Sequence, residues 1–207
     1  MTTDIKFGAR TREAIRISEK SLKIVSSFVK GDTPLDRIRR RCVMATGDPA
    51  FADLLRFSNE PVKAGVNAIQ KNATIFTDIK MAEVGITKRG HSCDIKCVLE
   101  SGEEIAETEG ITRTSAGFIA LEHMLHDAII VIGNAPSAAL TICRMIENGL
   151  MPALLVVTPV GFVNAAESKE YVRKLSVPSI TCVGTRGGTP VAVAIMNELI
   201  EMAAEQE

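Results

Sequence analysis

Hydrophobic residues follow a helical period in the first part of this chain. Apolar residues recur at roughly helical spacing over residues 11–29, and Gly31 supplies a stop. A second helix is predicted to begin at Thr33-Pro34, because Thr is a good amino-terminal cap and Pro suits the first helical position. A third helix is predicted over residues 60–69, opened by Glu60-Pro61. The first part of the chain is therefore predicted to be helical.

Short β-branched runs then alternate with further helical segments. They cover residues 73–79, 95–99, 128–132, 153–157 and 179–183, and three of them are almost wholly apolar, as strands buried on both faces are. Helices are predicted to start near Pro136, Asn164 and Pro190, which gives the βαβαβα order of a parallel sheet. No Pro, Gly or Ser-rich linker separates the two parts. We predict one α/β domain, residues 1–207, with a mainly parallel sheet flanked by helices and a helical amino-terminal part.

The loops that follow the last three predicted strands contain the candidate chemistry. Residues 133–137, 158–162 and 184–190 are rich in Gly and Pro, and each loop leads into a helix. Ligands bind at the carboxyl ends of strands in open parallel sheets, and free backbone N–H groups at a helix start can hold carboxylate or phosphate oxygens. The alternative is that these residues only make tight turns. Three such loops together favour a binding site.

Composition and charge exclude several classes of protein. The chain has 24 Lys plus Arg against 25 Asp plus Glu, and 46% of its residues are apolar, so neither disorder nor a strongly basic nucleic-acid surface fits. No apolar run reaches the ~18 residues that a membrane span needs, and the amino-terminal stretch lacks the apolar segment of a secretory signal. We expect a soluble, cytoplasmic protein with no nucleic-acid or membrane partner.

The five cysteines do not indicate a disulfide framework or a metal site. Their number is odd and three lie inside apolar runs, which suits buried reduced thiols. Cys93 and Cys97, with His91 close by, could contribute to a zinc site, but a tetrahedral site needs four ligands and no second cluster is visible. His123 and His126 suit a solvated helix end better than a metal pair. No metal is expected.

Positive charges on several loops suggest that the ligand is an anion. Lys88, Arg89, Arg113 and Arg186 can each hold a carboxylate, although each alone also fits a solvated surface charge. Neither the dinucleotide G-x-G-x-x-G motif nor the G-x-x-x-x-G-K-[ST] phosphate loop occurs in the sequence. A ligand with several carboxylates would use all of these charges.

The second predicted helix has two distinct faces. A core-facing stripe is predicted at Leu35, Ile38, Cys42 and Ala45, and the opposite side bears Arg37, Arg40, Arg41 and Met44 at helical spacing. A methionine among arginines indicates that a ligand or a partner subunit covers this face. An oligomer contact without chemical role is the alternative.

Several motifs resemble the precorrin-8X methylmutase family, also called precorrin isomerase, of corrin-ring (cobalamin) biosynthesis. The most specific are IGNAP at residues 132–136, PVGFV at 159–163 followed by AAESK at 165–169, and RGG at 186–188 with Asn197. Asp78, Gly85-Ile86-Thr87 and Thr112-Arg113 also fall where the family has them. The similarity extends from Arg41 to Asn197.

This resemblance implies a homodimeric isomerase that needs no external cofactor. Its substrate would be a polycarboxylate tetrapyrrole, precorrin-8X or cobalt-precorrin-8, and one methyl group would move from ring carbon 11 to carbon 12, giving hydrogenobyrinate or cobyrinate. The site would lie near the subunit interface. The residues expected to bind the ring are Arg41, Thr87, Lys88, Arg89, Arg113, Thr114, Ser115, Asn134, Gly161, Phe162, Arg186, Gly187 and Gly188.

The sequence departs from the family at one position. The family's Arg-x-x-His-x-x-Gly segment aligns with residues 41–47 and places Met44 where the family has its catalytic histidine. A thioether cannot donate a proton, whereas an imidazole titrates near neutrality. Another donor, such as His91, Lys88 or Arg89, could replace it. Alternatively, the chain binds a corrinoid or other tetrapyrrole without isomerising it, or acts on a different substrate.

Overall fold

One six-stranded sheet organises residues 11–205, which are the residues that the computed structural model describes. The strand order is β1-β6-β5-β4-β2-β3, and all neighbouring pairs are parallel except β1 with β6. The prediction of an α/β fold with a mainly parallel sheet is confirmed. The strands are β1 (Leu55–Ser58), β2 (Ile75–Thr77), β3 (Ile95–Cys97), β4 (Ile129–Ile132), β5 (Leu154–Val157) and β6 (Ser179–Cys182).

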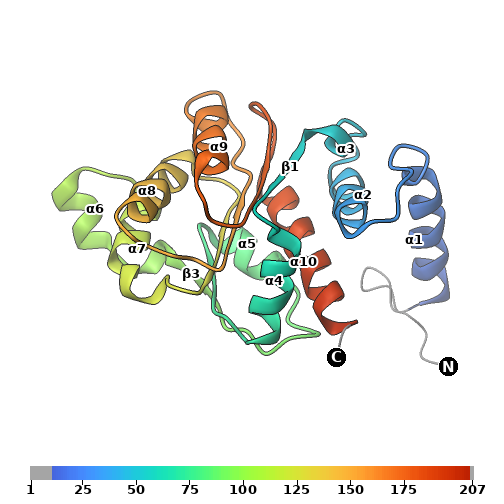
Figure 1. The fold of residues 1–207 in the computed structure, drawn as a ribbon, viewed down its shortest axis with the longest axis horizontal. Helices are drawn as coiled ribbons and strands as arrows, with labels where there is room; N and C mark the ends of the chain where they lie inside the picture. The colour runs from blue at the N-terminus through green and yellow to red at the C-terminus, as the bar shows by residue number, and fades with distance from the viewer. Residues whose placement is uncertain (1–10, 206–207) are drawn as a thin grey trace.

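Helices cover both faces of this sheet (Figure 1). α8 and α9 lie on one side of the strands, and α10 and α2 lie on the other, with α1 beyond α2. The α-helices are α1 (Arg12–Val25), α2 (Pro34–Thr46), α3 (Phe51–Leu54), α4 (Pro61–Gln70), α5 (Lys80–Gly85), α6 (Glu103–Glu109), α7 (Arg113–Ala120), α8 (Pro136–Glu147), α9 (Ala165–Lys174) and α10 (Thr189–Ala204).

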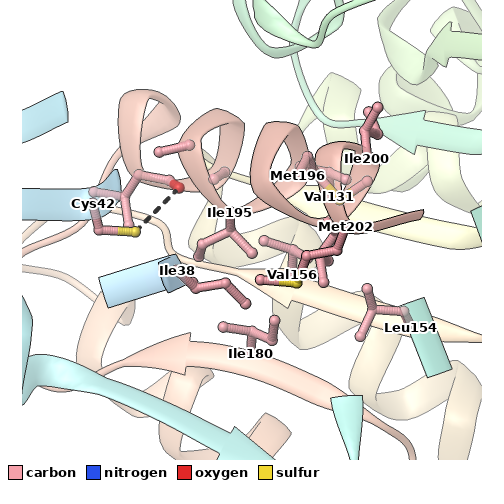
Figure 2. Close-up of a cluster of buried hydrophobic side chains, with 14 of the residues drawn as sticks. Ile38, Cys42, Val131, Leu154, Val156, Ile180, Ile195, Met196, Ile200 and Met202 are labelled. Carbon is pink, nitrogen blue, oxygen red and sulfur yellow. Dashed lines mark hydrogen bonds between the residues drawn. The ribbon is translucent and has the colours of Figure 1, made fainter. Parts of the chain in front are cut away.

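Alternating strand residues supply two separate cores. Ile129 and Val131 of β4 belong to one buried cluster with residues of α2, α4 and α10, whereas Ile130 and Ile132 belong to a second cluster with residues of α7, α8 and α9. Figure 2 shows the first cluster, in which Ile38 packs among residues of the sheet and α10. The central strands are therefore apolar on both faces, as their sequences predicted.

Local signals at the start of α2 act as predicted. The Thr33 hydroxyl accepts a hydrogen bond from the Asp36 N–H, and the Asp36 carboxylate accepts one from the Thr33 N–H, which is a reciprocal capping box. Pro34 occupies the first turn, where its missing N–H costs nothing. Gly47 ends the helix with a φ of 67°, in the left-handed region that glycine tolerates.

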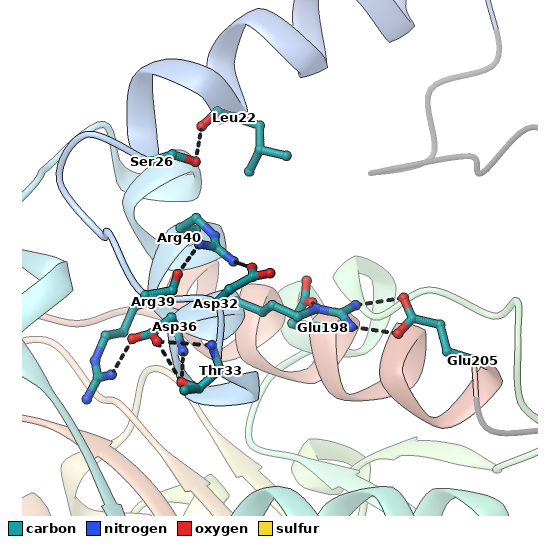
Figure 3. Close-up of polar contacts among 11 residues, drawn as sticks. Leu22, Ser26, Asp32, Thr33, Asp36, Arg39, Arg40, Glu198 and Glu205 are labelled. Atoms are coloured by element: carbon teal, nitrogen blue, oxygen red, sulfur yellow. Dashed lines mark hydrogen bonds and ion pairs between the residues drawn. The ribbon is translucent and has the colours of Figure 1, made fainter.

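The two faces of α2 differ in part from their prediction. Ile38 and Cys42 are buried, but Ala45 is exposed and Val43 is buried instead. The arginine face was expected to meet a ligand or a partner subunit, and two of its arginines meet α10 of the same chain instead. Arg37 and Arg41 both pair with Glu198 of α10, at 2.7 and 2.9 Å. Figure 3 shows Glu198 and Glu205 beside α2, and Arg40 paired with Asp32.

Several short elements were not predicted from the sequence. β1 has only four residues and lies at the edge of the sheet, antiparallel to β6, with Arg56 exposed. The helices α3, α5 and α6 are also short, with four, six and seven residues. A periodic pattern cannot be recognised over such lengths, because two turns of helix are needed before an apolar stripe repeats.

Removing the Glu198 side chain should destabilise the fold strongly. The Glu198 side chain is 5% exposed and pairs with two guanidinium groups. Glu198→Ala should lower the free energy of unfolding by about 3 kcal/mol or more, because it leaves both positive charges without this partner. Glu205→Ala is the matched control, because Glu205 pairs with Arg37 from a position that is 53% exposed and should cost about 1 kcal/mol or less. Urea unfolding of both variants measures the difference, and equal losses would contradict the role given to Glu198.

Candidate functional site

The sheet has a point where its connections diverge, between β2 and β4. The chain leaves β2 toward the edge strand β3, and leaves β4 in the opposite direction toward β5 and β6. In open α/β sheets the crevice at such a point, outside the carboxyl ends of the strands, is where ligands bind. The loops that follow β2, β4, β5 and β6 meet at this edge, so the candidate site is built from them.

A carboxylate of the chain itself occupies the crevice. Asp78, directly after β2, is fully buried and accepts hydrogen bonds from the N–H groups of Gly133, Asn134 and Ala135, at 3.2, 2.7 and 2.9 Å. Burial raises the pKa of Asp78, and the three N–H donors oppose that rise. The backbone amides predicted to hold a ligand anion at this loop already have an acceptor. What the loop leaves exposed is Asn134, whose side chain remains available to a ligand.

The loops after β5 and β6 are joined to each other through their backbones. Gly161 N–H donates to Thr185 O at 3.0 Å, and Gly188 N–H donates to Thr158 O at 2.6 Å. A Cβ atom on Gly187 would come within 2.3 Å of the Thr158 oxygen, so only glycine allows this approach. Gly187 therefore serves the packing of these two loops against each other.

An apolar tip projects from the β5–α9 loop. Phe162 is 94% exposed, and its neighbours Val160 and Val163 are exposed as well. A large exposed aromatic side chain beside two valines is unusual on a water-facing loop, and such patches mark contacts with a ligand or another protein.

The carboxyl end of α2 reaches the same edge of the sheet. The Arg186 guanidinium, in the β6–α10 loop, pairs with the Asp48 carboxylate at 2.6 Å, just beyond the end of α2. Met44, in the last turn of α2, is half-buried and packs against the core cluster that contains α10. Arg41 lies one turn earlier and pairs with Glu198 and Glu201. Met44 and Arg186 therefore belong to neighbouring elements, while Arg41 is engaged with α10.

A groove adjoins this edge on the other face of the sheet. It has a volume of about 790 Å³ and lies between α6, α7 and α8, with Asn164 of the β5–α9 loop at its border. Ser115 lines it, and the Thr112 and Ser137 hydroxyls, 2.8 Å apart, join α7 to α8 beside it. Thr114 is buried, whereas Arg113 is exposed and donates to Leu99 O.

The remaining expected site residues lie in the loop between α5 and β3, beside α10. Thr87, Lys88, Arg89 and His91 belong to the α5–β3 loop, which runs along α10 toward its carboxyl end. The Thr87 N–H donates to Asn197 Oδ1 at 2.8 Å in the middle of α10. Asn197 lies eight residues after Thr189, so Thr87 meets α10 about 12 Å beyond the strand-end loops at 1.5 Å per residue.

His91 uses both of its ring nitrogens within its own loop. Its Nδ1 accepts the Cys93 N–H at 3.0 Å, so the proton lies on Nε2, which donates to Thr87 O at 2.7 Å. This arrangement fixes the neutral tautomer and stabilises the loop. Any role of His91 toward a ligand would have to break one of these two hydrogen bonds.

The thiols are buried and reduced, as the sequence predicted. All five cysteines are free and buried, and burial raises the pKa of each thiol. Over residues 11–205, no group of three or more His, Cys, Asp or Glu side chains is arranged to hold a metal ion.

Comparison with known proteins identifies the family. The model of the CbiC family, precorrin-8X methylmutase, matches residues 16–202. The chain belongs to the precorrin-8X methylmutase family.

Relatives in this methylmutase family match the chain almost from end to end. A cobalt-precorrin-8 methylmutase of Methanocaldococcus jannaschii is 38% identical, over 97% of this chain and 99% of that protein. Another from Methanothermobacter thermautotrophicus is 36% identical, over 97% and 98%. The crystal structure of precorrin-8x methyl mutase from Thermus thermophilus has a TM-score of 0.85 and 34% identity, over 93% of this chain and 97% of that one.

Two residues of the methylmutase fold were missed by reasoning from sequence alone. Lys169 is fully buried and contacts both the β5–α9 and β6–α10 loops, and Glu198 is the shared partner of two arginines. The signal for Glu198 is an acidic residue within a mostly apolar helix. For Lys169, the only signal is its place in the family segment at residues 165–169.

Asp78→Ala should destabilise this methylmutase fold by about 3 kcal/mol or more, because three amide groups in the crevice lose their acceptor at about 1–3 kcal/mol each. Asp78→Asn should cost less, since one carbonyl oxygen remains. Asp94→Ala is the matched control, an exposed aspartate that should change stability by about 0.5 kcal/mol or less. Thermal and urea unfolding measure the three variants; a neutral Asp78→Ala would show that water can replace the carboxylate.

Proposed function

We propose that this chain is a methylmutase that acts on cobalt-precorrin-8 or precorrin-8X. It moves a methyl group from carbon 11 to carbon 12 of the ring and gives cobyrinate or hydrogenobyrinate. The observation that carries this proposal is the end-to-end match with cobalt-precorrin-8 methylmutases at up to 38% identity. The reaction is an intramolecular isomerisation, so it needs no external cofactor.

Exposed charges at the strand-end edge support a polycarboxylate ligand. Arg186 has a side chain that is 54% exposed, although it pairs with Asp48, and Arg113 is exposed at the start of α7. Exposed guanidinium groups suit carboxylates through charge-assisted hydrogen bonds. Phe162 offers an apolar surface for the ring itself. Lys88 and Arg89 are exposed in the α5–β3 loop and offer two further positive charges.

We further propose a homodimer that works in the cytoplasm. The described residues expose large apolar side chains on the β5–α9 loop, at Phe162 and Val163, and on α5, at Met81 and Val84. Patches of this kind favour association with a second copy. The five reduced thiols suit a reducing compartment. Among the described helices, none is long and apolar enough to cross a membrane.

One observation favours a second function, binding of the tetrapyrrole without turnover. Met44 occupies the position that the resemblance assigns to the family histidine, and its thioether cannot donate a proton. His91 is already bonded at both ring nitrogens. A methylmutase without this acid would depend on selecting the reactive tautomer of the ring by binding alone.

Met44→His should raise turnover of precorrin-8X by about 100-fold or more, because a positioned general acid contributes about 10²–10⁴ in rate. Absorbance spectroscopy follows the conversion, and binding of hydrogenobyrinate is measured in parallel. Met44→Leu is the matched control: it keeps an apolar side chain of similar volume and should leave the turnover of the unsubstituted protein unchanged.

The same experiment separates the two functions. Slow turnover by the unsubstituted protein supports the methylmutase. Tight hydrogenobyrinate binding with no turnover, and turnover only in Met44→His, would establish the binding protein instead. If neither ring compound binds to any of the proteins, both functions are wrong.

Phe162→Asp should weaken the homodimer by about tenfold or more in dissociation constant, because it places a charge in an apolar contact. Met151→Asp is the matched control, an exposed methionine in the α8–β5 loop at the opposite edge of the sheet. Sedimentation velocity over a range of concentrations measures both. A monomer at all concentrations in the unsubstituted protein would refute the dimer.

A further inference from the structure

The ammonium group of Lys169 is buried beneath the strand-end loops. Lys169 lies on α9 and its side chain is fully buried. Its Nζ donates to Pro159 O at 2.9 Å and to Arg186 O at 2.6 Å, and it lies 3.5 Å from Cys182 Sγ. Burial lowers the pKa of Lys169, and the Cys182 thiol opposes that change. Its partners are two carbonyl oxygens and a thiol, so no carboxylate balances the charge of the ammonium group.

The two carbonyl groups belong to different loops. Pro159 lies in the β5–α9 loop, two residues before Gly161, and Arg186 lies in the β6–α10 loop. Both loops carry residues expected to bind the ring, namely Phe162 in the first and Arg186 in the second. Lys169 therefore adds a side-chain link to the two backbone hydrogen bonds, from Gly161 and Gly188, that already join the loops.

Attachment of α9 to the sheet does not account for this lysine. Arg173, one turn further along α9, already bonds the helix to β6 through Thr181 Oγ1 at 3.0 Å and Cys182 O at 3.4 Å. Burying an ammonium group without a charged partner costs free energy that an apolar side chain would avoid. What Lys169 supplies, and an apolar residue would not, is donors to two carbonyl oxygens on separate loops.

The contacts of the β6–α10 loop reach the end of α2. Arg186 accepts from Lys169 through its backbone oxygen, and its guanidinium pairs with Asp48, just beyond the last turn of α2 that holds Met44. One residue thus connects the buried ammonium group to the segment where the family has its catalytic histidine.

We propose that Lys169 is a positioning residue, which holds the β5–α9 and β6–α10 loops in the arrangement that binds the tetrapyrrole. This inference rests on the proposed function for the identity of the ligand. The arrangement of the loops themselves does not depend on it, so the two parts are tested separately.

The first test measures the loops without any ligand. In Lys169→Met, hydrogen exchange of the Gly161 and Gly188 amides should become about tenfold faster or more, because the link between their loops is lost. Arg173→Met is the matched control: it removes a half-buried cation from the same helix but leaves the loop carbonyls bonded, so these two amides should keep their protection. Both variants are compared at equal global stability, set by urea. Equal exchange in the two variants would overturn the proposal.

The second test measures the ring. Hydrogenobyrinate should bind about 10–100-fold more weakly to Lys169→Met than to the unsubstituted protein and about equally well to Arg173→Met. Faster loop exchange with unchanged ring binding would refute the positioning role. If the unsubstituted protein itself fails to bind the ring, the proposed function is wrong, and the exchange result still decides whether Lys169 holds the loops.

A measurement on the unsubstituted protein covers the case in which Lys169→Met does not fold. With ¹⁵N-labelled lysine, a buried ammonium group that exchanges slowly gives its own resonance, and hydrogenobyrinate should shift that resonance. Binding of the ring with no change in the Lys169 signal would contradict the proposal.

Discussion

The burial of the sheet on both faces is the constraint on which the rest of the structure depends. Because β4 and β5 are apolar throughout, polar groups that could recognise a ligand are confined to the edges of the sheet. At the carboxyl edge, backbone N–H groups at the start of α8 would be left without partners in a buried crevice. Asp78 supplies the acceptor for three of them, and this single carboxylate fixes the point from which the loops diverge.

Those parts of the fold that depend on local patterns could be predicted from the sequence. The start of α2 was predicted from its cap at Thr33, and the central strands were predicted from their apolar sequences to within a few residues. What could not be predicted depends on contacts between distant segments. Nothing near Arg37 or Arg41 in the sequence indicates that Glu198, more than 150 residues later, is their partner. The edge strand β1 also depends on its neighbour β6 rather than on a pattern of its own.

The candidate site shows the same division. Its location at the loops after the strands followed from the strand and helix order, and the structure brings those loops together. The partners of their backbone groups could not be predicted, because a glycine that makes room for a ligand looks the same in the sequence as one that makes room for a neighbouring loop. Gly187 faces the Thr158 oxygen, and the amides of residues 133–135 face Asp78. The surface left for a ligand is therefore formed mainly by side chains, with Phe162 and Arg186 foremost.

The exposure of Phe162 links ring binding to association of two chains. Its side chain is 94% exposed, and its loop is bonded through Gly161 to the loop that holds Arg186. Phe162 can therefore meet both a ring held by Arg186 and a neighbouring chain. In the proposed homodimer the apolar tip at Phe162 would then have two partners, the ring and the second copy. Each would bury surface that the other leaves exposed, so ring binding and dimer formation would stabilise each other.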